Sequence, residues 1–401
     1  MALALLVCLG LVAYTYIGYP ALLALWAAAT EVLEDIRFVM GGADRRSPRR
    51  EGPWPMLTVV VAAYDEEACI AEKVENCLAL DYPADRIEVL VGCDGCTDRT
   101  AELARRTGDP RVRVAELSPR AGKAAVLTRL VAMSTGDVLL MTDANVALEE
   151  QAAKALARHF QDQRVGAVVG RLRLHGRSKR DRGEGLYWKY ETALKYLEGK
   201  RGCVLGANGG IYAVRRLLFQ PLRETTIVDD FVVPVRIASR GWRVPYEPQA
   251  VAHEETTGEV EQEFARRARI GAGDWQALAL VPEVLDPRAG FLHFAFVSHK
   301  LLRWLAPFLL FAGLSLSLAL ALRGSALASV ILALQLAFYA LALVGSRAAR
   351  RGALWRLASG AHYFVSMNLA LALGLWRFVR GTQQAAWEHT ARSAPPGVGA
   401  A

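Results

Sequence analysis

The sequence lacks two glycine-rich signatures that bind nucleotide phosphates. It contains no G-x-x-x-x-G-K-[ST] loop, and no G-x-G-x-x-G turn follows the first apolar run that indicates a strand. Both signatures hold phosphate through backbone N–H groups at the start of a helix. We therefore do not expect a P-loop nucleotidase.

Cysteine is scarce and does not show the spacing of a metal site. Cys93 and Cys96 form a single C-x-x-C pair, with no second pair and no histidine-rich partner nearby to complete four zinc ligands. The six cysteines are Cys8, Cys69, Cys77, Cys93, Cys96 and Cys203. In a reducing cytoplasm they need not form disulfides, so the sequence predicts neither a zinc site nor a disulfide framework.

Charged residues are missing from four long stretches. These are residues 2–30 and the runs between Arg303 and Arg323, Arg323 and Arg347, and Arg356 and Arg377. Each can supply the ~20 apolar residues that a helix needs to cross a bilayer. We expect four spans, one at 1–30 and about three within 304–378. A cleaved signal peptide is the alternative for the first, but that stretch has no basic start and exceeds the roughly 7–15 residues of a signal core.

The formal net charge of +8 does not point to nucleic acid, because many arginines lie beside the apolar stretches. Basic residues accumulate on the cytoplasmic side of a membrane protein. The arginines at 37–50 and 347–356 therefore predict a multi-pass protein of the plasma (inner) membrane with residues 31–302 in the cytoplasm. Arg377 and Arg380 oppose a fourth crossing, so either the segment 357–376 is re-entrant or interfacial, or the tail at 379–401 crosses, and its side stays open.

Strands and helices alternate between the membrane stretches. Apolar, β-branched runs indicate strands at 56–64, 87–92, 111–117, 137–143 and 165–174. Helical patterns lie between and after them, at 70–78, 97–106, 122–134 and 148–160. This alternation predicts an α/β domain with a mostly parallel sheet over 55–285, preceded by a basic linker at 31–54.

Acidic residues follow three of the predicted strands. Asp65 and Glu66 come after the first, Asp94 after the second, and Asp143 after the strand at 137–143. Ligands of parallel sheets bind beyond the carboxyl ends of the strands, so these carboxylates should converge there. Together they suggest a divalent cation with a phosphorylated ligand, and Lys123 could contact a phosphate or a base. Capping and turn formation would explain each acid alone, and Asp98 is expected to cap the helix that begins at Thr100.

Further candidates lie after residue 200. The glycine-rich turn at 206–210, with Asn208 and Gly209, permits close approach to a ligand, and Asp229 and Asp230 stand at the start of a helix. One of these acids is then available for proton abstraction. The pattern at 263–276 places Arg266, Arg269 and Gly273 on nearby turns, with Arg267 pointing elsewhere. These arginines could bind a departing diphosphate or, alternatively, an anionic lipid surface.

The ordered motifs resemble the membrane-integrated family 2 glycosyltransferases, which include cellulose, chitin and hyaluronan synthases. The motifs are AAYDEEACI, GCDGCTDRT, RAGKAAVL, LLMTDAN, GANGGIYAVRR, VDDF and RRARI, and the likeness extends to the tail WEHTAR. It implies a GT-A fold, a nucleotide-sugar donor such as a UDP-sugar, Mg²⁺ or Mn²⁺, and an inverting displacement. The acceptor would be a membrane lipid or a glycan.

The resemblance also implies roles for individual residues. Tyr64, Glu66, Asp94 and Lys123 would bind the nucleotide, Asp230 would be the catalytic base beside Asp229, and Asn208, Gly209, Arg266 and Arg269 would contact the acceptor or the diphosphate. The D-x-D metal motif falls on Asp143, Ala144 and Asn145. Because its second position is an amide, the site has one charge less, and His253 is a candidate further ligand.

A second departure concerns processivity. The Q-x-x-R-W motif of processive synthases keeps only its arginine here, Arg269, and lacks the glutamine and the tryptophan. This favours transfer of one or a few sugars, although Trp188 or Trp275 could replace the tryptophan and leave processive synthesis open. The segments 186–198 and 286–303 are expected to be interfacial helices. A nucleotide-binding transporter or scaffold, and a nucleotidyl or phosphoglycosyl transferase, are the remaining alternatives.

Overall fold

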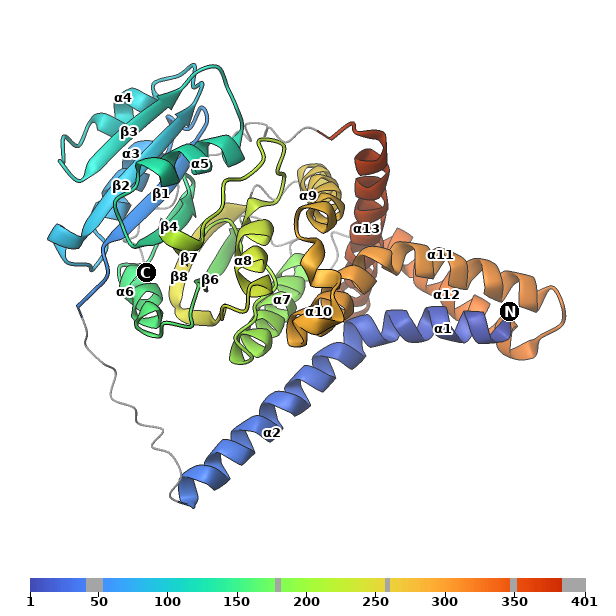
Figure 1. Ribbon diagram of the computed structural model, residues 1–401. Coiled ribbons are helices and arrows are strands. Elements are labelled where there is room, and N and C mark those ends of the chain that lie inside the picture. Colours follow the sequence, from blue (N-terminus) through green and yellow to red (C-terminus); the bar gives the residue numbers. More distant parts are fainter. Residues whose placement is uncertain (41–52, 177–181, 257–259, 347–351, 384–401) are drawn as a thin grey trace.

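The computed structural model describes residues 1–40, 53–176, 182–256, 260–346 and 352–383. Its centre is one eight-stranded sheet with the strand order β3-β2-β1-β4-β7-β6-β8-β5 (Figure 1). The strands are β1 Leu57–Ala63, β2 Ile87–Asp94, β3 Val112–Leu117, β4 Val138–Asp143, β5 Val146–Leu148, β6 Ala167–Gly176, β7 Tyr212–Arg215 and β8 Tyr246–Thr256. The first four pair in parallel, as predicted. Strand β7 runs antiparallel between β4 and β6.

Helices cover both faces of the sheet because its central strands are apolar on both sides. In β1, Val59 and Val61 face one core, and Val60 and Ala62 face the other. The first core is closed by α3 Ile70–Leu78, α4 Thr100–Arg105 and α6 Ala152–Ala157. The second is closed by α5 Lys123–Met133, α7 Arg182–Lys200, α8 Asp229–Ser239 and α9 Val260–Leu280. The domain is therefore a three-layer α/β/α structure.

Short helical turns complete the α/β domain. They are η2 Ala84–Arg86, η3 Arg158–Gln161, η4 Arg216–Leu218, η5 Pro282–Leu285 and η6 Pro287–Ala289. The last two lead from α9 into a continuous helical segment made of α10 Phe291–Ala295, η7 Phe296–Leu301 and α11 Leu302–Ala321. The expected boundary at 303 between an interfacial helix and a span thus falls inside one helix.

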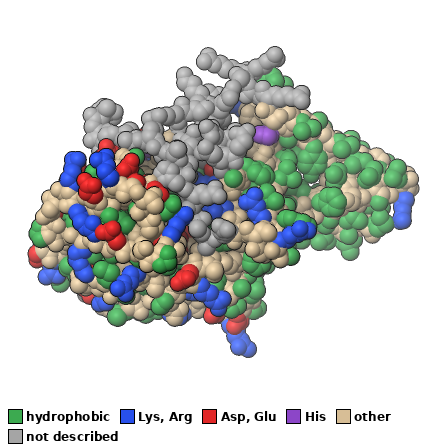
Figure 2. Space-filling view, turned by 90° about the horizontal axis from the view of Figure 1, so that it is seen from above, with side chains coloured by type: hydrophobic (Ala, Val, Ile, Leu, Met, Phe, Trp, Pro, Cys, Tyr) green, Lys and Arg blue, Asp and Glu red, His purple; other side chains and the backbone are tan. Residues whose placement is uncertain are grey.

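Three helices among the described residues are long and apolar enough to cross a membrane, not the four we expected. They are Ala2–Arg37, Phe291–Ala321 and Ala326–Ser346. The first consists of α1 Ala2–Ala13, η1 Tyr14–Gly18 and most of α2 Tyr19–Val39, so it runs past the predicted boundary at residue 30. The third is α12. Figure 2 shows apolar side chains covering the arm formed by α1, α11 and α12, whereas charged side chains gather over the α/β domain.

Helix α13, Ala353–Arg380, occupies the place of the expected fourth span. It is not among the candidate spans, and Figure 1 shows it lying steeply across α11 and α12. Its backbone packs tightly on α9, because a Cβ built on Gly374 would lie 2.7 Å from the backbone nitrogen of Ala272. Helix α13 is thus tied to the α/β domain. The tail motif WEHTAR lies outside the described residues.

Candidate active site

The carboxylates after β2 and β4 lie at one edge of the sheet. Both strands flank β1 in parallel, and Asp143 pairs with Ala62 while Cys93, next to Asp94, pairs with Ala63. The register therefore brings Asp94 and Asp143 to the same end of the two strands on either side of β1. The convergence predicted from the order of strands and acids is present.

Asp94 organises the loop that precedes α5. Its buried carboxylate accepts hydrogen bonds from the backbone N–H groups of Ala121, at 2.7 Å, and Gly122, at 2.9 Å. Gly122 has φ +90°, a conformation that favours glycine. The next loop residue upstream, Arg120, stacks on the Tyr64 ring at 3.5 Å from its centroid. Tyr64, Asp94 and Arg120 thus form one wall beside Lys123.

The AAYDEE loop is fastened to the turn after β2. Asp65, the one non-glycine residue with positive φ in the described chain, accepts a hydrogen bond from the Thr97 N–H at 2.8 Å. The N–H of Glu66 donates to Thr100 Oγ1 at 2.8 Å. Asp98 accepts from the N–H of Thr100, the first residue of α4, but the N-cap position belongs to Arg99 and not, as predicted, to Asp98. Cys96 also lies here, and its sulfur is close to carboxylate oxygens of Asp65 and Asp98. Hydrogen bonds of these side chains are sufficient to explain why they lie together.

Lys123 links the acidic groups from two distant parts of the chain. Its Nζ lies 2.8 Å from Asp143 Oδ1 and 3.5 Å from Asp229 Oδ1. Burial by itself would lower the pKa of Lys123, but the carboxylates of Asp143, Asp229 and Asp230 raise that pKa above its ordinary value. The lysine is therefore fully charged at neutral pH and holds the two acidic segments together.

The glycine-rich turn lies directly against this cluster. A Cβ built on Gly209 would be 2.9 Å from Asp143 Oδ2 and 3.5 Å from Lys123 Nζ. Any larger residue at 209 would displace one of the two charged groups. Asn208, next to it, accepts a hydrogen bond from Lys195 of α7. The turn thus positions backbone at the acidic cluster, as the sequence pattern predicted.

Asp229 and Asp230 begin α8 but have different surroundings. The Asp229 side chain is buried, and its Oδ2 has no hydrogen-bond partner among the described residues. Burial raises the pKa of Asp229 to about 6. The charge of Lys123 opposes this rise, whereas the carboxylates of Asp230 and Asp143 add to it. Asp230 instead is half-buried and lines the adjacent cavity. Asp230 is therefore the member of the pair that can meet a substrate.

That cavity has a volume of about 450 Å³ and connects the acidic cluster with the membrane helices. Asp143, Gly209, Asp230 and Arg266 line one part of it. Elsewhere its wall comes from η1, α7, the start of α11 and α13, through Tyr16, Tyr187, Trp188, Arg303, Trp304, Tyr363, Phe364 and Met367. A molecule that reached Asp230 from the membrane side would pass largely aromatic and apolar side chains.

The predicted arginines are arranged differently from the expectation. Arg266 lines the cavity, but so does Arg267, which was expected to point elsewhere; it pairs with Glu263 at 2.5 Å and stacks on Tyr187. Arg269 does not line the cavity. Burial lowers the pKa of Arg269, as does Arg266, while Asp230, Asp229 and Asp143 act in the opposite direction. A helical wheel cannot resolve these orientations, because α9 is covered on several sides.

His253 and its neighbour Glu254 face opposite sides of β8. His253 Nε2 lies 2.9 Å from Glu149 Oε1 and its Nδ1 lies 2.6 Å from His175 Nε2, and the residue does not line the cavity. Glu254 does line it and lies 3.4 Å from Asn145 Nδ2. Glu254 was not among the predicted site residues. The two-residue alternation of a strand could have found it, had β8 been predicted.

A buried set of charges between α7 and the membrane helices was also missed. Glu191 pairs with Arg303 and lies 3.7 Å from Lys300. Two turns further along α7, Glu198 accepts a hydrogen bond from Tyr19 at 2.9 Å and contacts His299 Nδ1 at 2.7 Å. No local sequence pattern predicts these pairs, because their members lie more than 100 residues apart in the chain.

Comparisons with known proteins agree on one family. A model described as Glycosyltransferase like family 2 matches residues 55–273. The β-monoglucosyldiacylglycerol synthase of Synechocystis sp. is 29% identical over 205 residues, 48% of this chain and 42% of that protein. The poly-β-1,6-N-acetyl-D-glucosamine synthase of Staphylococcus aureus is 26% identical over 233 residues, 54% of each chain. The matches thus span about half the length of these curated relatives.

A solved structure resembles nearly the whole chain. It is the mannosyltransferase PcManGT from Pyrobaculum calidifontis, in complex with GDP-Man and Mn²⁺. The TM-score is 0.68 at 23% identity, and the likeness covers 94% of this chain and 99% of that one. At this identity the likeness shows a shared fold that includes the membrane helices.

Proposed function

This chain belongs to glycosyltransferase family 2 and has a GT-A fold, and we propose that it transfers a sugar from a UDP-sugar to a hydroxyl group of a lipid-linked or polysaccharide acceptor. One observation carries the proposal. Asp143, Lys123, Gly209 and Asp230 meet at one end of a cavity whose other walls are membrane-associated helices. This arrangement joins a site for an anionic donor to a path for an acceptor from the membrane.

The donor would lie along the strand ends. Tyr64, Glu66 and Asp94 would bind the nucleoside, and Lys123 would contact the diphosphate. Asp143 and Glu254 line the cavity, and the Asn145 amide nitrogen lies 3.4 Å from Glu254; oxygen atoms of these three residues would hold a hard divalent cation, Mg²⁺ or Mn²⁺. Such an ion would neutralise charge on the departing diphosphate. Glu254 could then supply the charge that Asn145 lacks, and His253 is less suited because it bonds Glu149 and His175.

The acceptor would react beside Asp230. The acceptor oxygen forms a bond to the anomeric carbon while the bond from that carbon to the diphosphate oxygen breaks, which inverts the centre. The hydroxyl proton passes to the Asp230 carboxylate, and Asp229, buried behind it, holds Lys123 in place. Asn208 and Gly209 would border the reacting groups, and Arg266, with Arg269 behind it, would stabilise the leaving group.

The cavity wall favours a lipid-linked acceptor over a growing polymer. Trp188 and Trp304 line the cavity, whereas Trp275, one of the two predicted substitutes for the missing tryptophan, packs on Trp304 at 5.9 Å between ring centroids. Processive synthesis is the alternative, with Trp188 as the stacking residue. The comparisons with membrane-linked synthases support either acceptor class.

The test is the Asp230→Asn variant. We expect loss of sugar transfer by a factor of about 10²–10⁴, the range that a general base contributes, with nucleotide binding retained. Purified protein with Mn²⁺ and a panel of nucleotide sugars would be assayed for free UDP or GDP and, separately, for UDP binding. Asp85→Asn, an exposed change on the domain surface, is the control. Unimpaired turnover would remove Asp230 from the role of base, and nucleotide binding without any sugar consumption by the wild type would favour a transporter or scaffold.

A further inference from the structure

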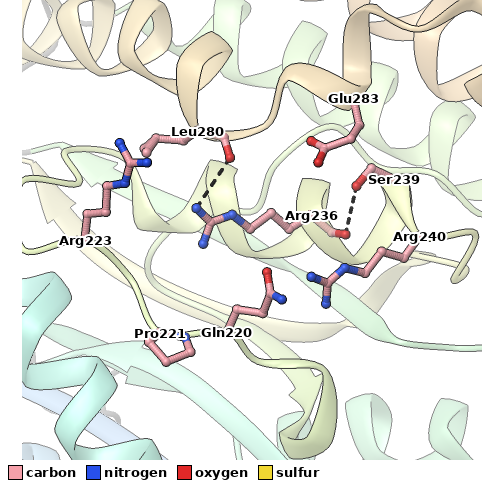
Figure 3. A pocket seen from close by; sticks show the side chains of 8 residues that line it. All are labelled: Gln220, Pro221, Arg223, Arg236, Ser239, Arg240, Leu280 and Glu283. Atoms are coloured by element: carbon pink, nitrogen blue, oxygen red, sulfur yellow. Dashed lines mark hydrogen bonds between the residues drawn. The ribbon is translucent and has the colours of Figure 1, made fainter.

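A second hollow, separate from the cavity at Asp230, lies between the end of α8 and the end of α9. Its volume is about 360 Å³, and it shares no lining residue with that cavity. It is lined by Gln220, Pro221, Arg223, Arg236, Ser239, Arg240, Leu280 and Glu283 (Figure 3). Three of these residues are arginines, and they come from the loop before α8 and from its last turns.

These arginines are short of counter-charge. Within the described residues none of the three forms an ion pair with a carboxylate, and Arg236 donates only to the Leu280 carbonyl, at 3.4 Å. Burial lowers the pKa of Arg236; Glu283 opposes this, while the like charges of Arg223 and Arg240 reinforce it. Part of this cationic charge complements the helix C-terminus. Arg223 is not on α8, however, so the helix dipole does not account for its presence in the same hollow.

The hollow also has a neutral group that suits an oxyanion. Gln220 offers its amide, whereas the Ser239 hydroxyl hydrogen is already donated to the Arg236 carbonyl, at 3.0 Å (Figure 3). Guanidinium groups bind phosphate oxygens with paired N–H donors, more strongly than neutral donors do. We propose that this hollow, formed by Arg223, Arg236, Arg240, Gln220 and Ser239, binds a phosphate-bearing anion.

The surroundings favour the headgroup of an anionic phospholipid as the source of the phosphate. Glu283 belongs to η5, and only the turn η6 separates η5 from the candidate span that begins at Phe291. Exposed leucines flank the hollow in the sequence: Leu217, 91% exposed, precedes Gln220, and Leu285, 43% exposed, follows Glu283. Basic pockets next to cytoplasmic membrane surfaces attract acidic headgroups. The site would hold the α/β domain against the membrane at a point away from the reacting groups.

The experiment measures binding to the full-length protein in neutral detergent by calorimetry and native mass spectrometry. The probes are short-chain phosphatidylglycerol, short-chain phosphatidylcholine and inorganic phosphate. Arg223→Gln with Arg240→Gln removes two exposed arginines from the hollow, and Arg105→Gln with Arg106→Gln makes the matched change in the last turn of α4. We expect phosphatidylglycerol to bind about tenfold or more weakly to the first variant, and equally to the control and the wild type.

The Glu283→Gln variant is expected to bind the lipid more tightly, a result that a folding defect cannot produce. Removing the one carboxylate of the hollow should tighten phosphatidylglycerol binding several-fold. If inorganic phosphate binds as well as the lipid and with the same dependence on the variants, the anion site is supported and its ligand is a soluble phosphate. Equal binding by all variants, or equal binding of phosphatidylcholine, would overturn the proposal.

Discussion

Single residues at the start of α8 show how burial separates two identical side chains. Asp229 and Asp230 are neighbours, yet one carboxylate is buried against Lys123 and the other lines the cavity. Burial raises the pKa of Asp229 to about 6. The Asp229 carboxylate holds Lys123, and the Asp230 carboxylate, which lines the cavity, is the one that we propose as the base. Two adjacent acids can thus have different roles without any difference in chemistry.

Asn145→Asp tests the proposed cation site at the residue scale. The change restores a D-x-D motif next to Glu254. Without metal, the new carboxylate repels that of Glu254; with metal, it is an additional anionic ligand. We expect Mn²⁺ to bind roughly tenfold more tightly, measured by electron paramagnetic resonance of free Mn²⁺. Gln161→Glu, in η3, adds the same charge away from the cavity and should leave Mn²⁺ affinity unchanged. Unaltered affinity in the Asn145→Asp variant would place the cation elsewhere.

Asp274 predicts a pH dependence of stability. Burial in the cavity wall raises the pKa of Asp274 to about 7, which Lys300 opposes and Asp230 reinforces. Between pH 4 and 7 the folded chain therefore holds a proton that the unfolded chain has released, so the free energy of unfolding falls as pH rises through this window. Asparagine carries no such proton. As the pH rises from 5 to 8, the free energy of unfolding of the Asp274→Asn variant should increase by roughly 2 kcal/mol relative to that of the wild type.

Thermal unfolding in detergent at several pH values would measure this gain. The difference in unfolding midpoint between Asp274→Asn and the wild type should grow up to about pH 7 and then level off. The exposed Asp85→Asn provides the control and should show a constant difference. A constant difference for Asp274→Asn as well would mean that Asp274 is ionised throughout.

At the scale of elements, the crossing of α9 and α13 closes the cavity. Tyr363, Phe364 and Met367 of α13 face the cavity, and Arg266 and Arg267 of α9 line it nearby. Small residues permit the close approach of the two backbones. A Cβ on Gly271 would lie 3.4 Å from the Leu371 Cα, and one on Gly374 would lie within 3.0 Å of three backbone atoms of α9. Helix α13 is thus placed by glycine packing.

Gly374→Ala should therefore separate these helices. The added methyl group meets backbone atoms that cannot rotate away, and such overpacking typically costs 1–3 kcal/mol, or roughly several degrees in unfolding midpoint. Sugar transfer should fall with it, because the cavity loses part of its wall. Gly360→Ala, in the same helix with nothing within 4 Å of the added carbon, should be neutral or stabilising by up to about 1 kcal/mol. Equal midpoints for the two variants would exclude tight packing at Gly374.

At the scale of the whole molecule, the three candidate spans among the described residues lie before and after the α/β domain in the chain. The segment Ala2–Arg37 precedes the domain, and Phe291–Ala321 and Ala326–Ser346 follow it as a hairpin. If both segments of the hairpin cross, these two crossings return the chain after Ser346 to the side on which the α/β domain lies. Arg377 and Arg380, which opposed a fourth crossing, would then lie on the same side of the membrane as the domain, the side that the arginines beside the apolar stretches predict to be the cytoplasm.

Cysteine labelling tests this arrangement. After replacement of the six native cysteines, Ser325→Cys in the turn between α11 and α12 should react with a membrane-impermeant maleimide in intact cells. A cysteine at Ser393, in the tail, should react only after the membrane is opened. Labelling of the tail in intact cells would show that the segment at α13 crosses the membrane.

The amino-acid sequence by itself determined the α/β class, the parallel half of the sheet and the set of acids at its edge. These follow from local information: β-branched runs that form strands, turn residues that end them, and the rule that parallel strands present their carboxyl ends together. The family likeness rests on the same motifs and is confirmed by the family model. The long apolar stretches likewise predicted the three candidate spans of the described residues, whereas the fourth expected span, at α13, is not among these candidates.

Only the tertiary structure decided which side chains share a surface. Strands β5, β7 and β8 were not predicted, so the opposite orientations of His253 and Glu254 could not be seen. Contacts between residues far apart in the chain determine the orientation of Arg267, the partners of Glu191 and Glu198, and the packing of α13 on α9. Periodicity describes how one element is patterned, but burial and pairing are set by the neighbours that packing brings to it.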